Sequence, residues 1–136
     1  MPAVFPSADW LNLLEDKLNN DSHYNEVAKK WEGDLLIDIQ PAGTLTQRLL
    51  LYFDLWHGKC RGVEYNPDPA KYAKPTYILR TTYDDVTSLL RGKLDPISAL
   101  MVNKLKLDGN LAYMMRNVPV VLDFMRCCRE ITTDIL

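Results

Sequence analysis

Apolar side chains near the start of the chain recur with the 3.6-residue period of an α-helix. The positions that follow this period are Trp10, Leu13, Leu14 and Leu18. Ser7 offers an N-cap, and the turn-forming residues 19–21 end the pattern. A shorter helix is expected next, capped by Ser22, carrying Trp31 on its apolar side and ending at Gly33.

The period then changes to two, which is typical of strands with one buried face. Alternating apolar side chains predict strands over residues 34–40, 48–57 and 76–82, with a short antiparallel partner at residues 63–65 after a turn over 57–62. Residues 66–75 contain three prolines and are expected to form a surface loop. A last short strand places Leu105 and Leu107 inward, with Gly109 in the turn after it.

Helical patterns dominate the second half of the chain. Thr82 and Asp85 resemble a capping box, and Asp95 followed by Pro96 marks another helix start. The segment from Leu111 is helical but interrupted at Pro119, where Asn117 is expected to cap a second segment. The order of elements predicts one α+β domain over residues 1–136, with a five-stranded, mainly antiparallel sheet, helices on one face and an extended C-terminal helical tail over 117–136.

Composition and charge exclude several classes of function. The 136 residues carry 16 basic and 18 acidic side chains, a formal charge of −2, which is too little positive charge to hold a nucleic acid backbone. No basic-apolar leader and no long apolar run occurs, so we expect a soluble, cytoplasmic protein. Three cysteines, two of them adjacent, indicate reduced thiols rather than a disulfide framework.

Few side chains suggest chemistry. His57 and Cys60 have metal-ligand spacing but no second pair of ligands to complete a site. Asp38 and Asp54 lie within predicted strands, where either one could act as a general base or simply face water. The sequence therefore predicts no metal, no cofactor and no catalytic residue. The basic residues that could attract an anionic head group, if they converge, are Arg91, Lys93, Lys104 and Lys106.

The C-terminal helices carry more apolar surface than one sheet face needs. Four of the five methionines lie there, and methionine adapts to irregular shapes more readily than branched side chains do. Three interpretations stay open: the methionines fill gaps in the core, they surround a guest molecule, or they contact a second subunit. A dimer contact is also possible on the other face of the sheet, which carries Leu36, Leu50, Tyr52, Trp56 and Ile78.

The stretch TTYDDVTSLLRGKLDPISALMVNKLKLDGNLAYMMRNV resembles the sterol carrier protein domain, the type-two non-specific lipid-transfer family. The matching pieces are Gly92, Leu94 and Pro96 in a turn, residues 103–106 entering a strand, and Gly109 with Asn110 in the next turn. Asn103 stands where the family often has glycine. The resemblance implies a five-stranded sheet covered by helices that enclose an apolar tunnel, with fatty acyl chains, fatty acyl-coenzyme A or sterols as ligands and no catalytic residue.

These observations together predict a lipid carrier that binds a long-chain ligand without chemistry and transiently contacts membranes. The segment after Pro119 is expected to act as a movable cover. The expected tunnel lining is Phe53, Leu79, Leu100, Met101, Met114, Met115, Leu122 and Met125. The alternatives are a dimerising or docking domain with a filled core, accessory to a lipid-metabolising enzyme, and a small enzyme that uses Asp38 or Asp54.

Overall fold

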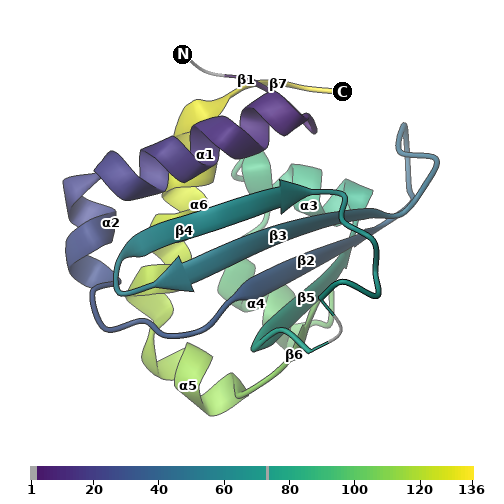
Figure 1. The fold of residues 1–136 in the computed structure, drawn as a ribbon. Coiled ribbons are helices and arrows are strands. Elements are labelled where there is room, and N and C mark those ends of the chain that lie inside the picture. The colour runs from purple at the N-terminus through teal and green to yellow at the C-terminus, as the bar shows by residue number, and fades with distance from the viewer. Residues whose placement is uncertain (1–2, 73) are drawn as a thin grey trace.

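A five-stranded sheet forms one layer of the molecule, and helices cover one of its faces (Figure 1). The structure is a computed structural model and describes residues 3–72 and 74–136. The helices are α1 (Ala8–Asn20), α2 (Ser22–Val27), α3 (Tyr83–Leu90), α4 (Pro96–Met101), α5 (Leu111–Arg116) and α6 (Val118–Ile131). The sheet contains β2 (Leu35–Gln40), β3 (Leu49–Trp56), β4 (Lys59–Tyr65), β5 (Tyr77–Thr82) and β6 (Leu105–Asp108), and the termini form β1 (Ala3–Phe5) and β7 (Thr132–Ile135).

The strand order is β4-β3-β2-β5-β6, and the only parallel pair among these five strands is β2 with β5. The mainly antiparallel α+β fold expected from the sequence is therefore confirmed, as a mixed sheet. Helices α3, α4 and α6 lie behind the sheet in Figure 1, while α1 runs along its β4 edge. This arrangement leaves an interior bounded by the sheet on one side and by helices on the other.

Side chains alternate along each strand between the face of the sheet that the helices cover and the outer face. Leu35, Ile39 and Phe53 point into the helical layer and are almost fully buried. On the outer face Asp38 is also buried, because the Arg48 guanidinium forms two hydrogen bonds to it of 2.8 and 2.9 Å. Part of the outer face of the sheet is thus covered by an ion pair rather than by a helix.

The outer face also covers much of its own apolar surface. The Tyr72 ring, from the loop before β5, stacks on Tyr52 with ring centroids 3.6 Å apart. Leu36 and Leu50, which suggested a dimer contact, are 5% and 2% exposed within the single chain. Trp56 remains 37% exposed there, with the Arg61 guanidinium 4.9 Å from its ring centroid.

Several helix starts agree with the caps expected from the sequence. The Ser7 hydroxyl accepts a hydrogen bond from the Trp10 amide, and the Thr82 hydroxyl accepts one from the Asp85 amide. Asp95 caps α4 in the same way, with Pro96 in the first turn. These local signals fix where α1, α3 and α4 begin.

Other boundaries differ from the expectation for identifiable reasons. Asp21, rather than Ser22, caps α2, since its carboxylate accepts from the Tyr24 amide, and α2 ends at Val27, before Trp31. The turn between β3 and β4 is shorter than expected because Gly58 adopts a φ of 78°. A Cβ at Gly58 would lie 2.4 Å from the Asn25 carbonyl oxygen, so only glycine permits this close approach.

The C-terminal tail is the largest departure from the predicted secondary structure. Asn117 makes no side-chain cap for α6, and its amide group instead donates to the Tyr113 carbonyl. The helical tail expected over 117–136 ends at Ile131, after which β7 pairs in parallel with β1. Figure 1 shows both termini together at the end of the molecule opposite α5. The β-branched residues Thr132 and Thr133 favour this strand over a further helical turn.

Candidate functional site

A cavity lies between the sheet and the helices. Its volume is about 90 Å³. Four strands and five helices contribute to it, namely β2, β3, β5, β6, α2, α3, α4, α5 and α6. Its walls are formed by Tyr24, Trp31, Leu35, Ile37, Leu55, Leu79, Thr81, Val86, Leu89, Pro96, Leu100, Leu105, Met114, Val120, Val121, Phe124 and Met125.

Two of the polar groups in this wall are already bonded within the protein. The Thr81 hydroxyl donates to the Lys104 carbonyl at 2.9 Å, and the Trp31 indole N–H donates to the Gly33 carbonyl at 3.0 Å. Burial raises the pKa of the Tyr24 hydroxyl, so it stays neutral. The cavity therefore favours an apolar guest, because a polar guest would lose its bonds to water without replacement.

Four of the eight residues expected to line a tunnel lie on this wall. Leu79 comes from β5, Leu100 from α4, Met114 from α5 and Met125 from α6. The structure brings these side chains together from segments far apart in the sequence.

The other four lie outside the cavity wall. Phe53 is fully buried and packs edge-on against Phe124, with ring centroids 5.4 Å apart. Met101 and Leu122 are 65% and 42% exposed. Met115 is half-buried but turned away from Met114, since adjacent helical residues point about 100° apart. Helical spacing identified the elements, but it did not identify which side chain of each element faces the hollow.

Several other wall residues follow the hydrophobic patterns of the sequence but were not predicted to line the tunnel. Leu35 and Ile37 follow the strand alternation, and Val86 and Leu89 follow the helical stripe of α3. Trp31 was expected on the apolar side of the second helix, but it lies beyond the end of α2 and reaches the cavity from the segment that follows.

The wall residue Trp31 belongs to an aromatic cluster that holds α5. Trp31 packs against Tyr77 and Tyr113, with both centroid distances 5.3 Å. Gly109, just before α5, permits this packing because a Cβ there would lie 2.7 Å from the Tyr77 ring. The cluster therefore attaches a short helix that has few other contacts to the rest of the fold.

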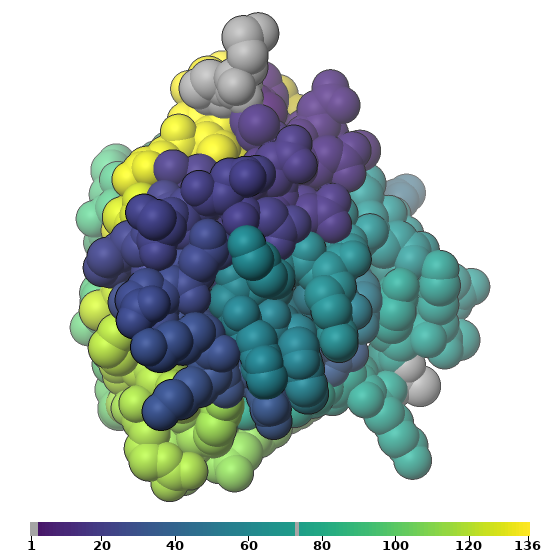
Figure 2. Space-filling model, turned by 60° about the vertical axis from the view of Figure 1, so that its left-hand side comes forward, coloured from purple at the N-terminus to yellow at the C-terminus, as the bar shows by residue number. Residues whose placement is uncertain are grey.

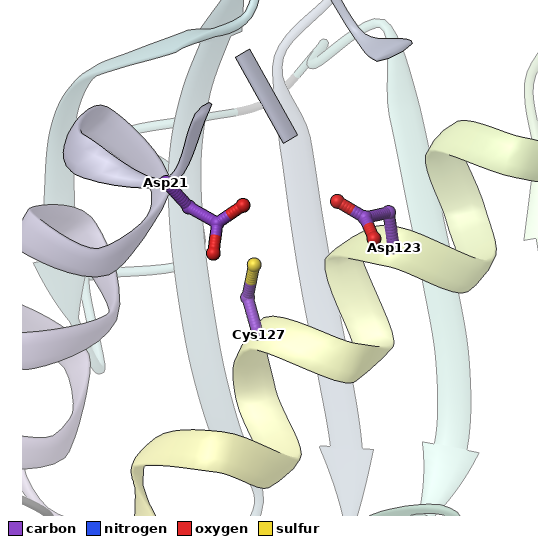
Figure 3. A group of neighbouring side chains, drawn as sticks. All are labelled: Asp21, Asp123 and Cys127. Atoms are coloured by element: carbon purple, nitrogen blue, oxygen red, sulfur yellow. The ribbon is translucent and has the colours of Figure 1, made fainter. Parts of the chain in front are cut away.

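Asp21, Asp123 and Cys127 form a second cluster, with one potential ligand atom of each within 4.8 Å of the others (Figure 3). The figure shows Asp21 at the start of α2 facing Asp123 and Cys127 on α6. Arg126 already donates to both carboxylates, at 2.7 Å to Asp21 and 2.8 Å to Asp123. A cation would have to displace this guanidinium, so we interpret the cluster as an ion-pair network that joins α1, α2 and α6.

The electrostatics of this network agree with a structural role. Hydrogen bonds from Arg126 hold the pKa of Asp21 well below its ordinary value. Burial opposes ionisation of Asp123, but bonds from Arg126 and His23 outweigh it and leave the pKa lowered. Burial raises the pKa of Cys127 to about 12, so its thiol keeps its proton.

The remaining candidate groups lie away from the cavity. Asp38 pairs with Arg48, and Asp54 pairs with Arg61, both on the outer face of the sheet. His57 bonds to Glu32, whereas the Cys60 thiol donates to the Gly62 carbonyl. Each of these groups has a protein partner.

The four basic residues expected to gather near one site occupy different parts of the surface. Arg91 lines a shallow depression with Arg129 and β7. Lys106 lies on β6, in register with Arg80 of β5. Lys104 and Lys93 flank the two ends of α4.

The three cysteines are expected to resist a thiol reagent in the folded protein. Cys60, Cys127 and Cys128 are each at most 4% exposed, and burial raises the pKa of Cys60 to about 12. Both effects remove the exposed thiolate that reacts. Addition of a chromogenic disulfide at neutral pH should label fewer than one thiol per chain, and all three after unfolding in urea. Fast labelling of a folded-state thiol would contradict the burial described here.

Comparisons with known proteins agree with the fold. A family model described as the SCP-2 sterol transfer family matches residues 6–121. A crystal structure of sterol carrier protein 2 superposes with a TM-score of 0.82 at 26% identity, covering 93% of this chain and 98% of that one. A Thermus thermophilus protein, TT1886, described as possibly a sterol carrier protein, gives 0.81 at 26% identity over 93% and 88% of the two chains.

A more distant structure, palmitated SCP2L2 from Aedes aegypti, has a TM-score of 0.60 at 16% identity, covering 85% of this chain and 94% of that one, and shows the shared fold. No curated protein sequence matches. None of the helices among the described residues is long and apolar enough to cross a bilayer. With the family model covering most of the chain and the fold in agreement, this chain belongs to the SCP-2 sterol transfer family.

Proposed function

We propose that this protein binds and transfers lipids without catalysing a reaction, holding the apolar part of its ligand between the sheet and α4, α5 and α6. The observation that carries the proposal is the cavity, whose wall is formed almost entirely by apolar side chains. Binding by sequestration needs no nucleophile or base. The general function of the family, binding and transfer of sterols and other lipids, supports it.

A fatty acyl chain is the ligand we would test first. The fold is shared with a structure described as palmitated, and an acyl chain is narrow enough to follow an irregular hollow. Each methylene moved out of water contributes about 0.8 kcal/mol before ordering costs are subtracted. Fatty acyl-coenzyme A and sterols remain further candidates.

A long chain needs more room than the cavity offers here, so part of the wall must move. The C-terminal half of α6 is fixed by the Arg126 network and by a bond from Arg129 to the Leu89 carbonyl. Its first turn has no side-chain cap, and α5 has only six residues. We therefore assign the movable cover to α5 and the first turn of α6, with Met114 and Met125 adapting their side chains to the guest.

Filling the cavity should abolish ligand uptake. Leu100→Trp places a larger side chain into the hollow, and we expect at least a tenfold loss of affinity for a fluorescent fatty acid, measured by titration without vesicles. Ser98→Trp is the matched control, because Ser98 is exposed on the same helix and does not line the cavity. Wild-type protein that neither takes up fatty acid or sterol nor releases lipid on organic extraction, with native mass spectrometry showing only the bare chain, would disprove the proposal.

A dimerising or docking domain is the second candidate, favoured by the exposed indole of Trp56 on the outer face. Removing residues 117–136 does not distinguish the two functions, since α6 contributes Val120, Cys127 and Ile131 to the core. Trp56→Ser is the better variant. A dimer in the wild type that Trp56→Ser converts to monomer, with no lipid uptake by either protein, would favour this candidate.

A further inference from the structure

The hydroxyl group of Tyr24 has no hydrogen-bond partner in the described part of the chain. The polar groups of Trp31 and Thr81 in the same cavity wall are bonded, whereas nothing donates to the Tyr24 hydroxyl or accepts from it. Tyr24 is 1% exposed, and no side-chain oxygen or nitrogen atom that is sealed from water lacks a partner among the described residues. The Tyr24 hydroxyl is therefore not sealed, and it adjoins the cavity that Tyr24 lines.

Tyr24 lies at one end of this cavity. Helix α2 is fixed against the turn between β3 and β4, because the Asn25 side-chain amide donates to the Gly58 carbonyl at 2.7 Å. Figure 1 shows α2 beside this turn, whereas β6 forms the opposite edge of the sheet. In Figure 2 the dark blue surface of α2 and of the segment after it fills the space between α1 and α5. The end of the cavity that holds the hydroxyl is thus covered by α2.

From Tyr24 the cavity wall continues across the sheet to an apolar end. The strands that form it are β3, β2, β5 and β6, which are consecutive in the sheet and lie about 4.8 Å apart, so the wall spans roughly 14 Å. At the β6 end it is formed by Leu105 of β6 and Leu100 of α4. The Thr81 hydroxyl, in register with Leu105, already donates to the Lys104 carbonyl. A linear lipid would therefore lie with an oxygen beside Tyr24 and its tail toward β6.

The surroundings of Tyr24 suit an uncharged oxygen and oppose a carboxylate. Among the described residues no basic side chain belongs to the cavity wall, and Arg126 of α6 already donates to Asp21 and Asp123. Burial raises the pKa of the Tyr24 hydroxyl, and the charge of Asp123 raises it further, so the hydroxyl keeps its proton and can donate it in a hydrogen bond. A carboxylate buried here would lack a cation, whereas a neutral oxygen would regain a bond that it loses on leaving water.

We propose that the Tyr24 hydroxyl is the polar anchor of the ligand and that it binds an uncharged hydroxyl or carbonyl oxygen of a lipid inside the cavity. This inference rests on the proposed lipid-carrier function and specifies its ligand. A phenol both donates and accepts, so an alcohol can use both capacities and a carbonyl group one of them. A free fatty acid gains nothing from this anchor, because its carboxylate stays in water.

The test compares Tyr24→Phe with the wild type, since this change removes the hydroxyl and keeps the ring. Decanol, decanoate and decane are titrated in turn against a bound fluorescent lipid, without vesicles. We expect Tyr24→Phe to weaken decanol binding about fivefold, the effect of one lost hydrogen bond. Its affinity for decane and decanoate should be unchanged. A loss for cholesterol but not for decanol would support the same anchor with an alcohol on a ring system in place of a linear chain.

Tyr77→Phe is the matched control. Tyr77 is 3% exposed and loses the same hydroxyl, but it does not line the cavity. Binding of all three ligands by this control should equal that of the wild type. Infrared spectroscopy adds a direct readout with a methyl ketone of the same length, whose C=O stretch should lie at lower frequency in the wild type than in Tyr24→Phe, because a hydrogen bond weakens the C=O bond.

Two results would overturn the anchor and leave the carrier function standing. The first is decanol and cholesterol binding by Tyr24→Phe that equals binding by the wild type, with the same C=O frequency in both proteins. The second is an equal loss of affinity for decanol and decane, which would mean that the variant disturbs the packing of the cavity. Wild-type protein that binds none of the ligands would contradict the carrier function as well.

Discussion

Replacing Phe53 with alanine is expected to lower the free energy of unfolding by about 4 kcal/mol. Phe53 is fully buried on β3 and makes an edge-on contact with Phe124 of α6, so its removal leaves a hole between sheet and helices that the strand backbone cannot close. Urea unfolding followed by circular dichroism measures the change as a shift in midpoint at constant slope.

Leu122→Ala is the matched control for this prediction. Leu122 is 42% exposed on α6, so its truncation should change stability by no more than about 0.5 kcal/mol. The two residues were both expected to line a tunnel, and the comparison separates a core position from a surface one. A loss of less than about 1 kcal/mol in Phe53→Ala would mean that the sheet and α6 are packed less tightly than described.

Replacing Arg126 with methionine should lower the free energy of unfolding by about 2 kcal/mol at neutral pH. Methionine keeps the apolar stem but leaves the 6% exposed Asp123 without its guanidinium partner. This loss of stability is smaller than for a fully buried ion pair, because Arg126 is itself 34% exposed and partly screened by water. Thermal or urea unfolding at pH 7 measures it, with Arg91→Met as the exposed control.

The same variant should show a distinct dependence on pH. The folded-state pKa of Asp21 lies below its ordinary value of 3.8, so the stability that this group contributes is fully present above that value and is lost as the pH falls further. In the variant, low pH protonates the Asp123 carboxylate, and a neutral carboxyl group is no longer destabilised by the missing guanidinium. The difference between variant and wild type should therefore shrink below about pH 4, and a difference that stayed constant to pH 3 would contradict the network.

Local patterns in the sequence predicted most of the elements correctly. Period-two runs identified β2, β3 and β5, because each buries one face against helices over at least six residues. Ser7, Thr82 and Asp95 located helix starts, since a cap depends on a few adjacent atoms. Asn103, where the family often has glycine, has a φ of 61°, a left-handed conformation that asparagine tolerates better than most residues.

Features that depend on long-range contacts could not be predicted in this way. Strands β1 and β7 have three and four residues, too few for alternation to show, and they exist because they pair with each other. The ion pair between Asp21 and Arg126 joins residues 105 positions apart. For the cavity, the hydrophobic period predicted the inner face of each element. It could not predict which side chains line the cavity, because that depends on how α5 and α6 cross the sheet.

The pairing of β1 with β7 determines where a tag or label attached to either end of the chain would lie. Phe5 and Ile135 are partners in that ladder, and the Leu136 amide donates to the Phe5 carbonyl, so the two ends of the polypeptide leave the fold side by side. A tag, a label or a surface anchor attached at either end would sit at the pole remote from α5. Such attachments would immobilise the molecule with α5 and the first turn of α6 facing the solution.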